Sequence, residues 1–221
     1  MDFGRAFSFP LEDPDWIRKI VITGLISLIP ILGWLYLAGW TIEVLRRVLR
    51  QDPTPLPDEI DFGNLMVEGL KALVISFVYS LPMILLVLPV IFTPLLTSGG
   101  GEDTMALATT LVTCCCTGLM LLYGLALAVL VPAGLANYAA TGDLGAAFRV
   151  GELIGMVRAA PGAYVLVIAG AIVVGILTSI ATAALIIGAF LVAAYGQAVN
   201  AHLYAQAYTE ARRSRGFAQM Y

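Results

Sequence analysis

Residues 161–209 read PGAYVLVIAGAIVVGILTSIATAALIIGAFLVAAYGQAVNAHLYAQAYT, and this stretch decides the fold class. It contains no Asp, Glu, Lys or Arg, and its nearest charged neighbours are Arg158 and Glu210. A helix needs about 20 apolar residues to cross roughly 30 Å of hydrocarbon. The stretch is too long for one crossing, and it predicts two transmembrane helices, over residues 161–184 and 188–210.

Two other stretches without charge predict two more crossings. The stretch that follows Lys71 indicates a span over residues 69–97, and the stretch that ends at Asp143 indicates a span over residues 104–135. In lipid, the backbone N–H and C=O groups of a segment must bond within that segment or within a closed barrel. Nothing in the pattern indicates a barrel, so we expect an all-α integral membrane protein.

The composition of the whole chain points the same way. Hydrophobic residues make up 60% of the 221 residues, charged residues make up 12%, and the mean hydropathy is +0.91. An ordinary soluble domain is about 45–50% apolar and about 25% charged. The net charge of −3 gives no cationic surface for nucleic acid, and the three cysteines are adjacent, which excludes a disulfide scaffold. We expect a single membrane domain over residues 1–221, with the lipid bilayer as its first partner.

The N-terminal segment, residues 14–50, allows two interpretations. One straight helix of this length would be about 55 Å long, which exceeds the thickness of a bilayer. Pro30 and Gly33 lie near its middle, where proline interrupts the helical hydrogen bonds and glycine permits a sharp turn. The segment is therefore either a kinked fifth crossing or a re-entrant hairpin.

The distribution of basic residues favours the hairpin. Cytoplasmic loops of membrane proteins carry an excess of Lys and Arg. If the C-terminal Arg212-Arg213-Ser214-Arg215 is cytoplasmic, nine basic residues lie inside and none outside before the N-terminal segment is counted. A re-entrant segment brings the count to twelve against none, whereas a crossing segment gives nine against three. We therefore expect the C-terminus in the cytoplasm and favour a cytoplasmic N-terminus.

The last predicted helix carries an unusual number of polar side chains in its cytoplasmic half. They are Gln197, Asn200, His202, Tyr204 and Gln206. Polar groups in lipid are costly, and they usually face the helix bundle or a water-filled cavity. These residues, with Glu43, are the candidate polar lining of a path for a small solute. The alternative is that they form hydrogen bonds between helices and have only a structural role.

His202 gives the sharpest expectation about this lining. We expect it to face the helix bundle together with Gln206 and Asn200, because a buried neutral histidine costs less when it has a partner. The expected partners are Tyr123, Asn137, Tyr138 or Glu43. Glu43 itself lies one helical turn before Arg46 and Arg47, so a local ion pair is expected there, and a binding or gating carboxylate is the alternative. Glu68 and Lys71, three residues apart, are also expected to pair.

Small residues spaced three or four positions apart, and so on one helical face, predict close helix packing. Ala171, Gly175, Ser179 and Ala183 form such a stripe, and Ala194, Ala198, Ala201 and Ala205 form another on the next helix. Faces of this kind let membrane helices approach closely. We expect a tight antiparallel hairpin of the last two helices, with a contact between subunits as the alternative for any face that stays free.

No pattern of catalytic or cofactor-binding residues stands out. There is one histidine, and the sequence lacks a nucleophile motif and a phosphate-binding loop. We expect no metal or cofactor and a non-enzymatic protein. The leading function is permeation of a small solute. The alternatives are a structural component of a larger membrane complex, with a copy of itself or another membrane protein as partner, and a membrane-embedded enzyme that modifies lipids.

Several short stretches together resemble a prokaryotic membrane protein family, the one described as domain of unknown function 4013. They are Phe7-Ser8-Phe9-Pro10 with Glu12-Asp13-Pro14-Asp15-Trp16, Leu56-Pro57 with Asp61-Phe62 and Gly69-Leu70-Lys71, Tyr138-Ala139-Ala140-Thr141-Gly142 with Ala147-Phe148, and Ala201-His202-Leu203-Tyr204 with Gln206 and Tyr208. The tryptophan usual after the Leu56-Pro57 turn is absent here. The resemblance implies a multi-pass protein of the prokaryotic cytoplasmic membrane, and it implies no activity.

Overall fold

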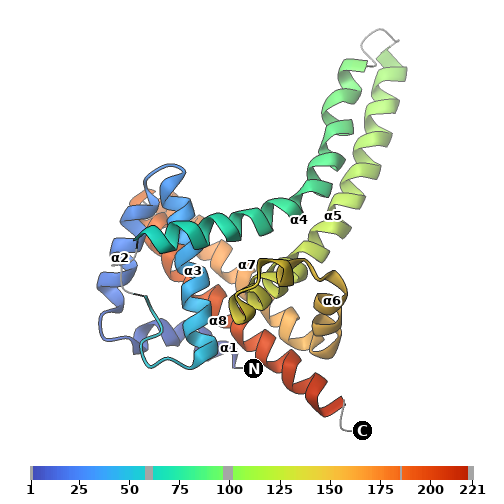
Figure 1. Cartoon of the computed structure of the whole chain (residues 1–221). Helices are drawn as coiled ribbons and strands as arrows, with labels where there is room; N and C mark the ends of the chain where they lie inside the picture. Colours follow the sequence, from blue (N-terminus) through green and yellow to red (C-terminus); the bar gives the residue numbers. More distant parts are fainter. Residues whose placement is uncertain (1, 58–61, 97–101, 185, 219–221) are drawn as a thin grey trace. The chain divides into compact units, whose positions relative to one another are not determined.

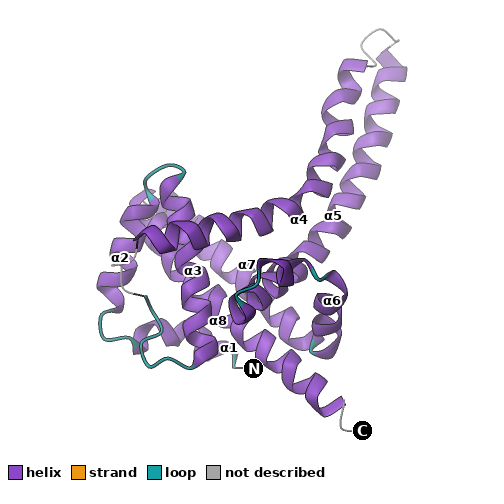
Figure 2. Ribbon diagram, viewed as in Figure 1, coloured by secondary structure: helices purple, strands orange, loops and turns teal. Residues whose placement is uncertain are grey.

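The computed structural model describes residues 2–57, 62–96, 102–184 and 186–218, and within those ranges the chain is helical with no strand (Figure 2). The helices are α1 (Phe3–Ser8), η1 (Phe9–Glu12), α2 (Trp16–Ser27), α3 (Leu32–Arg50), α4 (Phe62–Leu96), α5 (Glu102–Thr141), η2 (Leu144–Phe148), α6 (Val150–Ala159), α7 (Pro161–Ala184) and α8 (Ile186–Ala218). The all-α fold class is thus confirmed.

The chain divides into two compact units. The first unit comprises residues 1–75 and 129–221, and the second comprises residues 76–128. In the first unit α8 is the central helix, and it contacts α1, α2, α3, α6 and α7 (Figure 1). The second unit is an antiparallel pair made by parts of α4 and α5, in which the Tyr123 hydroxyl donates to the Tyr79 carbonyl oxygen over 2.6 Å. The single membrane domain expected over residues 1–221 stays a prediction.

Three of the described helices are long and apolar enough to cross a bilayer. These candidate spans are Phe62–Leu95, Ala106–Thr141 and Pro161–Thr182. They correspond to the predicted spans 69–97, 104–135 and 161–184. Their outer surfaces carry large apolar side chains, which suits contact with lipid: Leu85, Leu121 and Leu122 are 66%, 67% and 68% exposed. The fourth predicted span, 188–210, lies in α8, which is not among the three, and this crossing stays a prediction.

The N-terminal segment folds as two helices and not as one kinked helix. α2 and α3 pack against each other and are joined by residues 28–31, where Ile31 has a left-handed φ of 68° (Figure 1). A Cβ atom on Gly33 would lie 2.3 Å from the Ile26 carbonyl oxygen. Glycine is therefore required at the start of α3 for this reversal. That the pair enters a bilayer stays a prediction.

α3 and α4 cross at a point where both helices carry glycine. A Cβ atom on Gly39 would lie 1.8 Å from the Leu65 carbonyl oxygen, and one on Gly69 would lie 1.8 Å from the Leu35 carbonyl oxygen. The two backbones are therefore in direct contact, as small residues permit in membrane helices. This crossing fixes the first turns of α4 against α3, and it brings Glu68 of α4 next to Arg46 of α3.

The two small-residue stripes have different environments. On α8, Ala194, Ala198, Ala201 and Ala205 are buried. On α7, Ala171, Gly175 and Ser179 are exposed, and Ala183 has a side chain outside the described part of the structure. α7 and α8 do pack together, but α7 uses another face, on which Val174 meets Gly196 and Gly170 meets Leu203. Among the described residues of the first unit, the stripe on α7 is thus a face that no other helix covers.

Candidate functional site

A polar pocket of about 660 Å³ lies between the N-terminal residues, the end of α3 with its following loop, and the C-terminal half of α8. Its lining includes four carboxylates, Asp2, Glu12, Asp52 and Glu210, together with Arg5, Arg213, His202, Gln206 and Thr209. Two of the residues expected to line a path, His202 and Gln206, are therefore in its wall. We call this space the polar pocket.

Gln206 attaches the N-terminal residues to α8. Its side-chain oxygen accepts from the Asp2 backbone N–H over 2.9 Å, and its amide nitrogen donates to the Asp2 carbonyl oxygen over 3.0 Å. The Asp2 carboxylate in turn accepts from the Arg5 N–H over 3.0 Å and caps α1. One glutamine side chain thus pairs with both backbone groups of Asp2 and holds α1 at the edge of the polar pocket.

His202 is buried, with 8% of its surface exposed, and its contacts lie within the same unit. The Gln206 amide nitrogen is 2.9 Å from His202 Nδ1. Because an amide nitrogen can only donate, Nδ1 is the acceptor and the neutral ring carries its proton on Nε2. The ring stacks on Phe9, with 4.4 Å between the ring centroids. His202 is thus held between α8 and η1.

Three of the partners expected for His202, Asn137, Tyr138 and Glu43, bind other groups in the first unit, and a contact with Tyr123, which belongs to the second unit, stays a prediction. Among the described residues, Tyr138 donates to Glu68, Asn137 donates to the Ala146 carbonyl oxygen, and Tyr123 donates to the Tyr79 carbonyl oxygen. The Glu43 carboxylate lies 3.4 Å from Arg47 Nε and 3.8 Å from Arg46 Nη1. His202 instead contacts Gln206, which was expected to lie beside it, and Phe9 of the N-terminal segment, for which the sequence gives no local signal.

The remaining predicted lining residues lie on another side of α8. Gln197, Asn200 and Tyr204 are spaced by three and four residues, which puts them on one helical face, and His202 with Gln206 occupies a different face. Asn200 is 8% exposed, and its side-chain oxygen has no hydrogen-bond partner in the described structure. Glu43 also lies away from the lining of the polar pocket. The six candidates therefore do not converge on one site.

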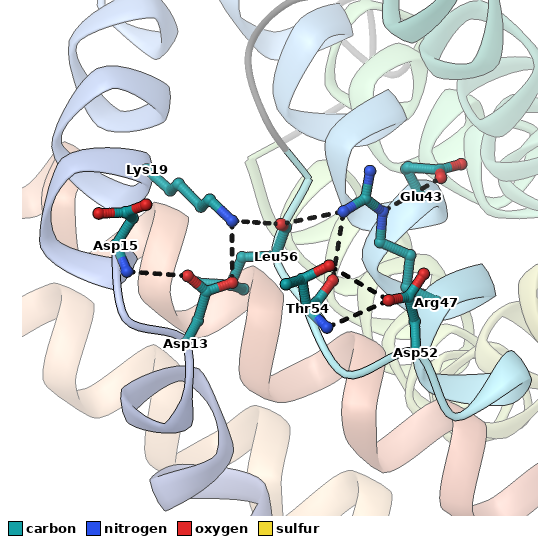
Figure 3. Close-up of polar contacts among 8 residues, drawn as sticks. All are labelled: Asp13, Asp15, Lys19, Glu43, Arg47, Asp52, Thr54 and Leu56. Atoms are coloured by element: carbon teal, nitrogen blue, oxygen red, sulfur yellow. Dashed lines mark hydrogen bonds and ion pairs between the residues drawn. The ribbon is translucent and has the colours of Figure 1, made fainter.

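A buried ion pair anchors the loop that borders the polar pocket (Figure 3). Lys19 Nζ donates to Asp13 Oδ2 over 2.9 Å, and the two side chains are 5% and 0% exposed. Lys19 Nζ also donates to the Leu56 carbonyl oxygen over 2.9 Å. Buried charges are tolerated when they are paired and fully hydrogen-bonded. The backbone of the loop is thus tied to the start of α2.

The same carbonyl oxygen also binds the end of α3. Arg47 Nη1 donates to the carbonyl oxygens of Leu56 and Thr54, over 3.2 Å in each case (Figure 3). The Thr54 backbone N–H donates to Asp52 Oδ1 over 3.1 Å, and this bond holds the pKa of the Asp52 carboxyl below its usual value of 3.8. Asp52 is therefore ionised at neutral pH and contributes its charge to the polar pocket.

A second charged cluster gathers around Glu68, whose side chain is 7% exposed. Its carboxylate forms an ion pair with Arg46, accepts from Lys71 Nζ over 2.7 Å, and accepts from the Tyr138 hydroxyl over 2.6 Å. The Arg46 guanidinium also lies 5.4 Å from the centroid of the Tyr138 ring. The local pair of Glu68 with Lys71 follows from their spacing, whereas the contacts to Arg46 and Tyr138 join α3, α4 and α5.

Comparison with known proteins gives one match. A family model described as "Protein of unknown function (DUF4013)" matches residues 22–187, which is three quarters of the chain. The chain belongs to the DUF4013 family. The resemblance found in the sequence is thereby confirmed. A search of curated proteins and a search of solved structures each give no match.

Several of the residues on which the resemblance to DUF4013 is based make specific contacts in the structure. The Leu56 carbonyl oxygen accepts from Lys19 and Arg47, Gly69 permits the crossing of α3 and α4, and Tyr138 binds Glu68. Asp61 lies outside the described residues. His202 and Gln206 lie beyond the matched residues 22–187. In this DUF4013 protein the matched region therefore contains the charged cluster of Glu68, while the α8 wall of the polar pocket lies outside that region.

Proposed function

We propose that this DUF4013 protein is a non-enzymatic protein of the prokaryotic cytoplasmic membrane through which a small polar solute permeates, with the polar pocket as the mouth of the path. The observation that carries the proposal is the pocket itself. It has a volume of about 660 Å³, and its wall combines His202 and Gln206 with six charged side chains. Sites for small molecules are typically concavities of this size, with a few polar groups that fix the orientation of the ligand.

The contact between Asp2 and Gln206 supports a topology with both termini in the cytoplasm. Gln206 lies close to the basic C-terminal residues, and Asp2 bonds directly to it. The two residues must lie on the same side of a bilayer. In this topology α8 is the fourth crossing, and α2 with α3 forms a re-entrant hairpin that returns to the cytoplasm. The polar pocket then opens toward the cytoplasm.

The charge of the pocket wall supports selection against anions. Four carboxylates and two arginines leave an excess of negative charge. Charged walls concentrate solutes of the opposite sign. We therefore propose that the permeating solute is a small cation, a zwitterion or a neutral polar molecule.

The proposal is tested by flux measurements in reconstituted liposomes. The probes are choline, glycerol and methanesulfonate, which are a fixed cation, a neutral solute and a fixed anion of similar size, and their entry is followed by light scattering after a hyperosmotic step. Wild type should admit choline and glycerol faster than empty liposomes and should not admit methanesulfonate. His202→Ala should change the choline and glycerol rates. Rates equal to those of empty liposomes would overturn the proposal.

A structural component of a larger complex is the second candidate, and one observation favours it. The stripe of Ala171, Gly175 and Ser179 on α7 is exposed, and a Cβ atom on Gly175 would meet nothing within 4 Å. Such faces let another membrane helix approach. Gly175→Leu therefore tests this candidate without disturbing the fold of one chain. The oligomeric state in nanodiscs, measured by light scattering, should fall in this variant, and an unchanged monomer in both proteins would exclude a contact between copies through this face.

A further inference from the structure

A second pocket, of about 320 Å³, lies in the first unit between α3, the end of α5 and α8. Three arginines line it, Arg46, Arg50 and Arg212, and no carboxylate does. The rest of its wall consists of Leu49, two alanines at the end of α5, Tyr208 and Thr209. We call it the arginine pocket. Its charge is opposite to that of the polar pocket. The two pockets are neighbours along α8, where Thr209 lines both.

The three guanidinium groups differ in how they are held. Arg46 is fixed by the ion pair with Glu68 and by the ring of Tyr138. Arg212 donates to the Tyr208 hydroxyl over 3.0 Å from Nε and over 2.8 Å from Nη2, so this side chain is oriented by a neutral group. Arg50 is exposed at the end of α3. Two of the three positions are thus pre-ordered before any ligand arrives.

Among the described residues, only one of the three arginines, Arg46, forms an ion pair with a carboxylate. Glu43 and Glu68 both lie within ion-pair distance of Arg46. Within the described residues, no carboxylate lies at such a distance from Arg50 or Arg212. Arg50 still interacts electrostatically with the Asp52 carboxylate, but the guanidinium groups of Arg50 and Arg212 stay outside any ion pair, and each can form two parallel hydrogen bonds to a phosphate group.

The position of the arginine pocket along α5 indicates the source of the anion. Ala139 and Ala140 line the pocket and lie in the last turn of the candidate span Ala106–Thr141. The end of a span lies at the level of the lipid headgroups. Basic pockets between helices at the cytoplasmic end of membrane proteins bind the phosphates of anionic lipids. The positive charge of the pocket and its depth at the headgroup level thus both favour the phosphate of an anionic lipid as the ligand.

We propose that the arginine pocket binds a phosphate group, supplied by the headgroup of an anionic phospholipid or by a free phosphate, through Arg50 and Arg212, with Arg46 completing the wall. The bound phosphate gives an anionic partner to the two guanidinium groups that form no ion pair with a described carboxylate. The phosphate of a headgroup also joins the ends of α3 and α8, because one guanidinium comes from each helix. This site is separate from the proposed permeation and does not depend on it.

Native mass spectrometry of the full chain in detergent tests the proposal. Phosphatidylglycerol and phosphatidylcholine are titrated separately, and the lipid-bound fraction is measured for wild type, for Arg50→Gln with Arg212→Gln, and for the control Arg158→Gln. Arg158 is exposed on α6 and does not line the pocket. Wild type should bind phosphatidylglycerol more tightly than phosphatidylcholine, and the double variant should lose about tenfold of that affinity, whereas the control should not change. The conservative variant Arg50→Lys with Arg212→Lys should retain part of the binding.

Inorganic phosphate separates the two sources. If a lipid is the ligand, inorganic phosphate should not raise the Tm above that in chloride at equal ionic strength. If inorganic phosphate raises the Tm of wild type and not that of the double Gln variant, while the two lipids bind equally, free phosphate is the ligand. Binding of phosphatidylglycerol by the double Gln variant at the wild-type level, with no response to inorganic phosphate, would overturn the proposal, as would an equal loss in Arg158→Gln.

Discussion

Lys19 and Asp13 form an ion pair of 2.9 Å in which both side chains are almost wholly buried, and the same lysine also holds the backbone of Leu56. The pair thus joins the start of α2 to the loop that follows α3. Exposed ion pairs on the same segment differ sharply: Arg5 and Glu12 lie 3.8 Å apart with more than half of each side chain exposed. The two pairs allow a direct test of what burial does to an ionic contact.

Asp13→Asn should destabilise the protein by about 3–5 kcal/mol, because it removes a fully buried carboxylate charge that lies 2.9 Å from the buried Lys19 ammonium. The double variant Asp13→Asn with Lys19→Met should lose less than the sum of the two single variants, because it removes both charges. Thermal unfolding in detergent measures the series, and Glu12→Gln is the control that should leave the Tm unchanged. Additive losses in the double variant would contradict this account of the pair.

Gly39→Ala and Gly69→Ala should each lower the Tm, with a loss of about 1–3 kcal/mol or more, because the new methyl group meets a backbone carbonyl oxygen that cannot move independently of its helix. Gly63→Ala is a matched control on the first turn of α4, where a Cβ atom meets nothing within 4 Å. That substitution should be neutral or stabilising, since alanine favours a helix over glycine. Equal losses at the three positions would argue against a close crossing of α3 and α4.

Substitutions around Glu68 should give a graded series of stability losses. Glu68→Gln should cost about 3–5 kcal/mol, because Lys71 loses its counter-charge and Arg46 keeps only the more distant carboxylate of Glu43. Tyr138→Phe removes one hydrogen bond and should cost about 1 kcal/mol. Lys71→Met should cost least, because 40% of the lysine side chain is exposed. Denaturant unfolding checks the order, and a loss in Lys71→Met as large as in Glu68→Gln would contradict it.

Glu210→Gln should lower the rate of choline flux more than the rate of glycerol flux, because it removes one negative charge from the wall of the polar pocket. Glu152→Gln is the matched control: Glu152 lies on α6, outside the lining of the pocket. The measurement is the ratio of choline to glycerol rates in liposomes. A ratio that does not change in Glu210→Gln would show that this carboxylate does not influence the path.

The topology predicts that a cysteine at position 3 is labelled only from the cytoplasmic side. The substitution is Phe3→Cys in a chain whose Cys114, Cys115 and Cys116 are replaced by serine. A membrane-impermeant maleimide should label intact cells poorly and inverted vesicles well, as it should for a cysteine introduced at Ser214. Labelling of position 3 from outside, with position 214 labelled from inside, would restore a fifth crossing and exclude the hairpin that returns to the cytoplasm.

The sequence predicts the helices better than it predicts their contacts. The span over residues 161–184 has the same limits as α7, because Arg158 and Pro161 mark its beginning and the apolar run marks its length. By contrast, α4 begins at Phe62, earlier than the predicted span 69–97, because Glu68 is accommodated inside the fold by Arg46 and Tyr138. These partners are 22 and 70 residues away, and no local spacing indicates them.

In the candidate site, too, the contacts within one helix follow from the sequence and the contacts between distant residues do not. The pairs of Glu43 with Arg46 and Arg47 follow from their positions on one helix. The contacts of His202 with Phe9 and of Gln206 with Asp2 join residues from opposite ends of the sequence. Gln206 binds the backbone N–H and C=O of Asp2, and every residue except proline has both groups. A sequence pattern contains no signal for such backbone partners, and the Leu56 carbonyl oxygen, which accepts from Lys19 and Arg47, is another case.

The bonds between Asp2 and Gln206 have a consequence for synthesis of the chain. α1, α2 and α3 all pack on α8, which follows them in the chain after α4, α5, α6 and α7. At translation rates of about 5–20 residues per second, the first fifty residues wait roughly 10–30 s for their packing partner. During that interval α3 already has α4 as a neighbour, but α1 lacks the helix on which it packs, so a nascent chain that stops before α8 should remain bound to insertion factors or chaperones. Release from these factors then indicates that α8 has been made and that Gln206 has bonded to Asp2.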